Sequence, residues 1–281
     1  MSKIAYLNSK YINFNKAKIH IEDRGLQFSD SVYEVVPFYN KKLIDFSFHA
    51  KRLKYSLKEL QIKYIVKEDK LKKIFNKIIR LNKIRNGIVY LQITRGVQPR
   101  DHDYRNNLIP NLIIYTINKK LNLPNKNFIC EKAITYKDLR WKRRYIKTVS
   151  LLANVLAKKE AVRKKAYEAI LIDNGKITEA TASNVWIVKN NKLITHPSNT
   201  DILKGITRET VIKLIKKNKL NLKEISFTKK ELYNADEVFI TSASSFVTPI
   251  IKVDSKLVNK GKIGRITLQL ATLYADYFIN E

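Results

Sequence analysis

The sequence predicts a mixed α/β fold that is divided into two domains. The chain has 281 residues, and one domain usually takes about 150. Strand-like and helix-like patterns alternate along it, and the polar segment 119–127 interrupts them as a linker. We therefore expect a smaller N-terminal α/β domain over residues 1–118 and a larger C-terminal mixed α/β domain over residues 128–281.

Hydrophobic periodicity predicts the elements of the N-terminal domain. Strands are expected at 17–21 and 32–38, followed by two amphipathic helices with apolar stripes at helical spacing. Residues 96–110 are polar without periodicity, and a loop of this length in a compact domain is often functional. The helices are expected at 46–61 and 67–82, and two later strands at 88–95 and 111–117.

The C-terminal domain is expected to be richer in strands. The dipeptide Asn174-Gly175 is typical of a hairpin turn, so strands are predicted on either side of it. In chain order we expect a strand at 128–135, a helix at 150–165, hairpin strands at 167–173 and 177–188, a helix opening at 205–208, strands at 237–242 and 247–253, and a helix from about 262.

The net charge of +30 raises the possibility of a nucleic-acid-binding protein without catalysis. Two observations argue against this class. The chain has 42 lysines against 13 arginines, whereas phosphate and base recognition favours the bidentate arginine fork. The lysines are also spread over the whole chain and accompany many Ile and Asn residues, which share A/T-rich codons. We therefore expect no nucleic-acid partner.

Several common functional motifs are absent from the sequence. The single Cys130 excludes an intramolecular disulfide and a cysteine-based metal site. The four histidines do not form H-E-x-x-H or another metal-binding spacing, and no G-x-S-x-G occurs. The N-terminus lacks the apolar core of a signal peptide, and runs such as 112–117 are too short to span a membrane. We expect a cytoplasmic chain with no metal and no membrane partner.

Lys147 is a candidate nucleophile. It ends a short strand-like run and precedes an apolar helical segment whose next charge is Lys158. A lysine in apolar surroundings loses solvation, which lowers its pKa and makes a neutral amine available for reaction with an aldehyde. The alternative is a lysine whose aliphatic stem covers apolar surface while its ammonium reaches water.

Glu179 is a candidate acid because it enters a segment of small and hydroxyl residues just beyond the hairpin turn. A carboxylate in such a place is able to hold a proton on a heterocyclic nitrogen. The alternative is a solvated glutamate at a strand end.

Three features suit a phosphate group. The segment Gly205-Ile206-Thr207-Arg208 opens a helix with unpaired backbone amides and a threonine hydroxyl, although ordinary helix capping explains it equally. Ser242 and Ala243 begin a turn rich in amides and hydroxyls. Arg52 lies at the edge of an apolar helical stripe, where it is either a phosphate ligand or a side chain that reaches water.

Arg100 and His102 lie inside the long polar loop. An arginine holds a carboxylate with two parallel hydrogen bonds, and a histidine adds a third donor. The alternative is a pair of exposed loop charges without a ligand.

Together these motifs resemble the class IV pyridoxal-phosphate aminotransferases, and within them the bacterial D-amino acid transaminases. The resemblance covers essentially the whole chain. Its characteristic order is a glutamate, an asparagine five residues later, a threonine and a G-I-T-R helix start, which Glu179, Asn184, Thr195 and Gly205 provide. The matching segments are E-D-R-G-L-Q-F-S-D-S-V-Y-E-V-V (22–36), H-A-K-R-L (49–53), T-R-G-V-Q-P-R-D-H (94–102), I-K-T-V-S-L-L-A-N-V-L-A-K (146–158), Y-E-A-I-L-I-D-N-G-K-I-T-E-A-T-A-S-N-V-W (167–186), I-L-K-G-I-T-R (202–208) and F-I-T-S-A-S-S-F-V-T-P (239–249).

The resemblance implies fold-type IV, pyridoxal 5′-phosphate as cofactor, and a role for each candidate residue. Lys147 is implied to bind the cofactor aldehyde as a Schiff base and then to move the proton between substrate Cα and cofactor C4′. Glu179 is implied to keep the pyridine nitrogen protonated, so that the ring accepts electrons. The implied phosphate ligands are Arg52, the amides of Ile206 and Thr207, and the Ser242–Ala243 turn.

The resemblance also implies how the substrate is held. Tyr33, Arg100 and His102 are implied to surround its α-carboxylate, the last two from the partner subunit of a homodimer. The R-x-H pair is typical of D-specific members, so the implied reaction is transamination between a D-amino acid and a 2-oxo acid, for example D-alanine with 2-oxoglutarate. The alternatives are a branched-chain or other class IV aminotransferase and an aminodeoxychorismate-lyase-like enzyme.

Three positions depart from the family pattern. Ser31 replaces the glycine of the turn before Tyr33, and Trp186 replaces a phenylalanine or tyrosine. Ala243 stands where a phosphate-binding hydroxyl is common, so one side-chain bond is lost while the backbone amide remains.

Overall fold

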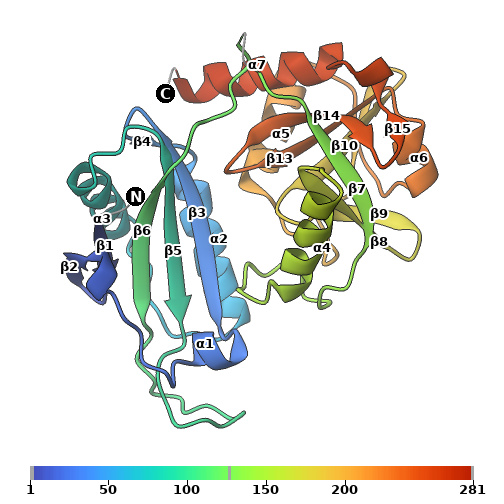
Figure 1. Cartoon of the computed structure of the whole chain (residues 1–281). Helices are drawn as coiled ribbons and strands as arrows, with labels where there is room; N and C mark the ends of the chain where they lie inside the picture. The colour runs from blue at the N-terminus through green and yellow to red at the C-terminus, as the bar shows by residue number, and fades with distance from the viewer. Residues whose placement is uncertain (1–2, 126–127, 280–281) are drawn as a thin grey trace. The chain divides into compact units, whose positions relative to one another are not determined.

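The computed structural model describes residues 3–125 and 128–279 (Figure 1). These residues form two compact units. The N-terminal unit comprises the residues up to Leu121 together with Ile146–Ser150, and the C-terminal unit comprises Asn122–Tyr145 together with the residues from Leu151 onward. The sequence places one boundary at 119–127, whereas the contacts divide the chain at Leu121 and again on both sides of 146–150.

The N-terminal unit is built on a six-stranded antiparallel sheet with the strand order β2-β1-β6-β5-β3-β4. Its strands and helices are β1 Ile4–Leu7, β2 Lys10–Asn13, the 3-10 turn η1 Phe14–Lys16, α1 Arg24–Phe28, β3 Ser31–Tyr39, β4 Lys42–Leu43, α2 Phe46–Glu59, α3 Glu68–Leu81, β5 Gly87–Thr94 and β6 Leu112–Asn118.

Side-chain alternation along β3 separates the core of this unit from its other face. Val32 and Val36 are buried and share one hydrophobic cluster with Leu53 of α2 and Ile78 of α3. Each fully buried aliphatic side chain of this kind contributes roughly 1.5–3 kcal/mol. Tyr33 has the opposite parity in the strand, so it lies on the face away from this cluster.

A short segment of chain from beyond the linker completes β3. Thr148 forms an antiparallel bridge with Val32, and the Val149 amide donates to the Ser31 carbonyl at 3.3 Å. The Tyr33 amide donates to the Lys147 carbonyl at 3.0 Å. The segment 146–150 therefore acts as an additional partner for the start of β3.

The C-terminal unit is built on a nine-stranded mixed sheet with the order β12-β11-β10-β13-β14-β7-β8-β9, and β15 pairs with β14. The pairs β11–β12, β14–β7 and β7–β8 are parallel. The elements are β7 Glu131–Lys137, α4 Leu152–Arg163, β8 Glu168–Asp173, β9 Lys176–Ala180, β10 Asn184–Lys189, β11 Lys192–Thr195, α5 Ile206–Lys217, β12 Leu222–Glu224, α6 Lys229–Tyr233, β13 Glu237–Ser242, β14 Phe246–Val253, β15 Lys256–Leu257, the 3-10 turn η2 Asn259–Gly261 and α7 Arg265–Ile279.

Helices cover both faces of the β7–β8 part of this sheet. Ala157 and Ala161 of α4 share a cluster with Ile134 and Leu171, whereas Ile170 faces a second cluster that includes Leu232 of α6. Small alanines on α4 let the helix approach the strands closely. The predicted mixed α/β class is confirmed.

Two of the predicted strands are wrong in detail. Residues 17–20 have no regular structure, and the first strands are instead β1 and β2, which a turn at Asn8 and Ser9 joins. These strands are only four residues long, and β2 carries a lysine and an asparagine, so periodicity does not reveal them. The strand expected at 177–188 is interrupted at 181–183, which separates β9 from β10. Within the described part of the chain, no helix combines the length and apolar character needed to span a bilayer.

Candidate active site

Lys147 and Tyr33 form one structural pair in the N-terminal unit. In addition to the backbone bond between them, the Lys147 Nζ lies 4.3 Å from the centroid of the Tyr33 ring. The Lys147 amide donates to Ser56 Oγ of α2 at 3.2 Å, and the Tyr33 ring stacks on Tyr90 with 5.8 Å between centroids. The backbone of Lys147 is thus hydrogen-bonded to β3 and α2, and its half-buried side chain lies over the Tyr33 ring.

Arg52 forms a buried ion cluster with Glu34 and His49. Its Nε and Nη2 each donate to one Glu34 oxygen at 2.8 Å, and His49 Nδ1 lies 2.7 Å from Glu34 Oε2. Burial raises the pKa of Glu34, but the Arg52 guanidinium and His49 outweigh it and hold the pKa far below its usual range. Burial lowers the pKa of His49, although the neighbouring Glu34 carboxylate opposes this shift. The Glu34 carboxylate therefore fixes the orientation of the Arg52 guanidinium.

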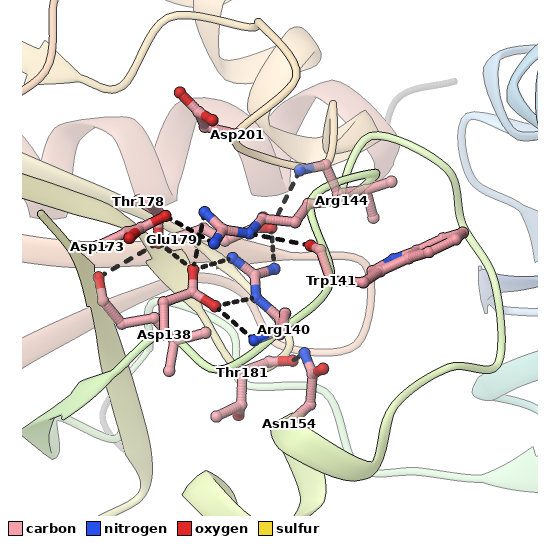
Figure 2. A network of polar contacts seen from close by, with 12 residues as sticks. Asp138, Arg140, Trp141, Arg144, Asn154, Asp173, Thr178, Glu179, Thr181 and Asp201 are labelled. Atoms are coloured by element: carbon pink, nitrogen blue, oxygen red, sulfur yellow. Dashed lines mark hydrogen bonds and ion pairs between the residues drawn. The ribbon is translucent and has the colours of Figure 1, made fainter.

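Glu179 of β9 is 4% exposed and lies in a polar network of the C-terminal unit, shown in Figure 2. Arg140 Nη1 and the Leu203 amide both donate to Glu179 Oε1, the latter at 3.0 Å. Asn184 Nδ2 donates to Glu179 Oε2 at 3.1 Å. Burial raises the pKa of Glu179, and the Arg140 guanidinium and the Leu203 amide offset part of this rise.

The loop after β7 is fixed by two arginines. Arg140 Nε and Nη2 donate to the two oxygens of Asp138 at 3.0 and 2.8 Å. Arg144 Nη1 lies 3.2 Å from the same carboxylate, and its Nη2 donates to Asp173 at 2.7 Å. Figure 2 shows Arg140 between the carboxylates of Asp138 and Glu179. The guanidinium of Arg140 therefore pairs with two buried acids at once.

The N-terminus of α5 lies next to this network. Its cap residue, Gly205, makes no side-chain capping bond, and Thr207 in the first turn is 2% exposed. A Cβ at Gly205 would lie 2.0 Å from Asn184 Oδ1, so only glycine fits there. Asn184 Nδ2 also donates to the Leu203 carbonyl at 3.0 Å, which ties Glu179 to the start of α5. The first amides of α5 point along its axis and suit an anion.

The Ser242–Ala243 turn contains one hydroxyl pair. Ser242 Oγ and Ser245 Oγ are 2.7 Å apart, and the Ser245 amide donates to Ser242 Oγ at 3.2 Å. Ala243 adds no side-chain donor, so any ligand of this turn meets its backbone amides and the Ser242 hydroxyl.

Arg100 and His102 lie on the connection between β5 and β6, which has no regular secondary structure from Gln98 onward. Both side chains are exposed. The Arg100 guanidinium carbon lies 4.6 Å from the centroid of the Phe28 ring, and the His102 ring lies 5.4 Å from the same ring. The structure therefore brings the two predicted carboxylate ligands together on one aromatic support.

Comparison with protein families identifies the family of the chain. Residues 31–253 match the family model described as amino-transferase class IV. The chain belongs to the class IV aminotransferase family. This confirms the predicted family, and the cofactor of this class IV aminotransferase is pyridoxal phosphate.

D-alanine aminotransferases are among the relatives of this class IV aminotransferase. The Bacillus licheniformis enzyme is 40% identical over 275 residues, which cover 98% of this chain and 96% of the relative. The Staphylococcus aureus enzyme (strain MSSA476) is 37% identical over 281 residues, which cover 99% of this chain and 98% of the relative.

Solved structures confirm the predicted fold type. The branched-chain amino acid aminotransferase of Escherichia coli superposes with a TM-score of 0.91 at 24% identity, over 100% of this chain and 94% of that one. The branched-chain aminotransferase of Thermoproteus uzoniensis, solved with norvaline, gives 0.89 at 25% identity over 100% and 96%. At these identities the likeness establishes the fold alone.

The C-terminal unit of this class IV aminotransferase fits the two polar ends of pyridoxal phosphate. Glu179 is a buried carboxylate, which is the acceptor that a pyridinium N–H requires. The start of α5 is a helix N-terminus without a side-chain cap, which suits a phosphate. Leu203 and Asn184 connect the two through their hydrogen bonds to Glu179 at 3.0 and 3.1 Å.

Two of the three departures from the family pattern are accommodated by hydrogen bonds. Ser31 is fully buried and its Oγ accepts a hydrogen bond from Gln92 Nε2 at 2.9 Å. Trp186 is fully buried, donates from Nε1 to Thr241 Oγ1 at 3.0 Å, and stacks on Phe239.

Sequence reasoning missed Arg140 and Glu34. Glu34 had a detectable signal, because its parity in β3 places a charge among the buried residues Val32 and Val36, where a cation is required. Arg140 lies in an irregular loop and had no comparable signal.

Proposed function

We propose that this class IV aminotransferase moves an amino group between a D-amino acid and a 2-oxo acid, for example from D-alanine to 2-oxoglutarate to give pyruvate and D-glutamate. The observation that carries the proposal is the similarity over nearly the whole chain to D-alanine aminotransferases. The R-x-H pair at Arg100 and His102 supports D-specificity, because it offers three donors to a carboxylate from one side.

Lys147 is the proposed catalytic residue. Pyridoxal phosphate, when bound, supplies an electron sink that stabilises negative charge at the substrate Cα. The Lys147 Nζ would hold the cofactor at its aldehyde carbon, and as a free amine it would move a proton at the substrate Cα. The contact of Nζ with the Tyr33 ring restricts the directions from which the lysine reaches that proton.

Glu179 is proposed to hold a proton on the pyridine nitrogen. For this the carboxylate must stay ionised although it is buried, and burial opposes ionisation. The Arg140 guanidinium and the Leu203 amide supply the compensating positive potential. A neutral residue at position 179 would leave the ring nitrogen without a partner for its proton.

The remaining residues are proposed to bind the phosphate and the substrate. The amides of Ile206 and Thr207, the Ser242–Ala243 turn and the cation of Arg52 are the phosphate ligands. Tyr33, Arg100 and His102 hold the substrate α-carboxylate. We further propose a cytoplasmic homodimer in which Arg100 and His102 act in the site of the partner subunit.

The half-reaction tests this function. Protein loaded with pyridoxal phosphate is mixed with D-alanine or L-alanine in the absence of an acceptor, and the absorbance of the bound cofactor is followed. We expect D-alanine to convert the aldehyde form to the amine form and to release one equivalent of pyruvate. Conversion by L-alanine alone would favour the branched-chain alternative. A lyase would leave the cofactor in its aldehyde form with both isomers, because alanine carries no leaving group.

A further inference from the structure

Arg24 of α1 binds the backbone of the loop that carries Arg100 and His102. Its Nη1 donates to the carbonyl oxygens of Asp101 at 2.7 Å and Asp103 at 3.1 Å, and its Nη2 donates to the carbonyl oxygen of His102 at 3.1 Å. One guanidinium therefore contacts three successive peptide groups of an otherwise irregular loop.

This arrangement depends on the shape of the guanidinium. The side chain of Arg24 is buried, and its Nε donates to Asp30 Oδ2 at 3.0 Å, so its orientation is set from both ends. A guanidinium presents its N–H groups in a rigid planar fork, whereas a lysine ammonium has three donors on one atom. A lysine at position 24 would not reach all of these partners at once.

Phe28, one helical turn after Arg24, supports the side chains of the same loop. Its ring lies 4.7 Å from the Arg24 guanidinium carbon and 4.6 Å from that of Arg100, and the His102 ring packs against it. A guanidinium over an aromatic face is attracted by the negative face of the ring. Arg24 therefore fixes the loop backbone, while Phe28 orients the two side chains.

Helix α1 is itself fixed to both strands from which the loop emerges. Its cap residue, Asp23, accepts from Thr94 Oγ1 of β5 at 2.7 Å and from Asn111 Nδ2, next to β6, at 2.7 Å. Asp30, at the other end of α1, pairs with Arg95 through two hydrogen bonds of 2.6 and 3.0 Å. The support is thus attached to the rigid sheet rather than to the loop alone.

We propose that Arg24 and Phe28 are positioning residues that set the affinity of the enzyme for the substrate α-carboxylate, because they hold Arg100 and His102 in their binding geometry. This inference rests on the proposed function. Neither residue is a catalytic residue, since each acts through the loop. Small displacements of groups that hold a substrate reduce rates on the order of 100-fold.

Steady-state kinetics of Arg24→Lys and Arg24→Met test the backbone contacts. We expect the KM for D-alanine and the inhibition constant of propionate, a carboxylate without an amine, to rise roughly 10- to 100-fold while kcat changes little. The matched control is Arg85→Lys, an exposed arginine of the same unit that donates to Asn40. An unchanged KM in a folded Arg24→Met variant would overturn the proposal.

Hydrogen exchange separates positioning from general destabilisation. In Arg24→Met, amides in peptides covering 98–108 should exchange faster while those of β3 and β5 keep the wild-type rate. Phe28→Leu keeps an apolar side chain but removes the aromatic face, and we expect it to raise KM without faster exchange in 98–108. A rise in KM that accompanies faster exchange throughout the sheet would instead show a global loss of stability and would contradict the positioning role.

Wild-type enzyme in the same assays distinguishes the two proposals. If the wild type does not convert D-alanine, the proposed function has failed. If the wild type converts it and the Arg24 and Phe28 variants keep its KM and its propionate inhibition, only the positioning role has failed.

Discussion

The carbonyl oxygen of Lys147 accepts a hydrogen bond from the Tyr33 amide, and the Lys147 side chain lies over the Tyr33 ring. Backbone and side chain of the two residues are therefore coupled within one compact unit, although 114 positions of sequence number separate them. Any movement of β3 at Tyr33 moves the proposed nucleophile with it.

Replacement of Lys147 by arginine should abolish transamination. Arginine keeps the positive charge over Tyr33, but it stays protonated and does not react with an aldehyde. We expect turnover to fall about 10⁴-fold or more. Lys73→Arg, an exposed position on α3, is the matched control and should retain activity. Borohydride reduction of the holoenzyme followed by peptide mapping should label Lys147, and a label on another lysine would refute the assignment.

Replacement of Arg140 by methionine should destabilise the C-terminal unit in a pH-dependent way. Glu179 would then be buried without its cation, whereas Asp138 would keep Arg144; removing one partner of a buried ion pair typically costs about 3–5 kcal/mol. The pKa of Glu179, which burial already raises, would rise further above its unfolded value of about 4.3, because Arg140 would no longer oppose the burial. The stability lost on removing Arg140 should therefore be larger at pH 8 than at pH 5, because at the lower pH a folded Glu179 with a raised pKa takes up a proton and buries no charge.

Urea denaturation at the two pH values measures this difference. Arg163→Met is the control, because the Arg163 side chain is exposed and pairs with Glu160 on the same helix. Equal losses for Arg140→Met at pH 5 and pH 8 would mean that the guanidinium does not hold Glu179 ionised.

The Glu34 cluster predicts loss of stability in acid. The folded-state pKa of Glu34 lies far below the unfolded value of about 4.3. Its contribution to stability is therefore complete above pH 4.3 and declines as the pH falls toward the folded-state pKa. We expect the unfolding free energy of wild type to fall more steeply between pH 6 and pH 3 than that of Glu34→Gln. Asp69→Asn, which removes an exposed acid of α3, should keep the wild-type slope.

Replacement of Gly205 by alanine should weaken cofactor binding. The new Cβ would clash with Asn184 Oδ1 and displace either that side chain or the start of α5. We expect the dissociation constant for pyridoxal phosphate to rise at least about tenfold, measured by fluorescence titration. Gly175→Ala is the control, because its strain comes from a φ of +76° with nothing within 4 Å. That variant should lose stability but keep its cofactor affinity.

Periodicity predicted the long elements of the fold because their apolar stripes face large clusters. Leu53 and Leu57 of α2 and Ile74 and Ile78 of α3 are all buried, as their spacing requires. The sequence did not reveal α1, because a five-residue helix is too short for a stripe. The proposed role of α1 depends on contacts with a loop some 77 positions away. A local sequence pattern does not encode such contacts.

The candidate site residues were found by motif, whereas their supporting residues were not. Lys147, Glu179 and Arg100 belong to short motifs that are recognisable in a single sequence. Arg140 and Arg24 act through carboxylate oxygens and peptide carbonyls that only the folded chain brings near them.

The return of residues 146–150 to the N-terminal unit has a consequence for synthesis of the chain. When the ribosome has made residues 1–121, the start of β3 still lacks the partner segment that bonds to Ser31 and Tyr33. This unit is completed only after the lysine segment has left the ribosome, since domains acquire their contacts as the chain emerges. A fragment ending near the linker would therefore carry Tyr33 paired with Gln92 of β5 but without the carbonyl that accepts its amide. The proposed nucleophile is thus one of the last parts to join that sheet.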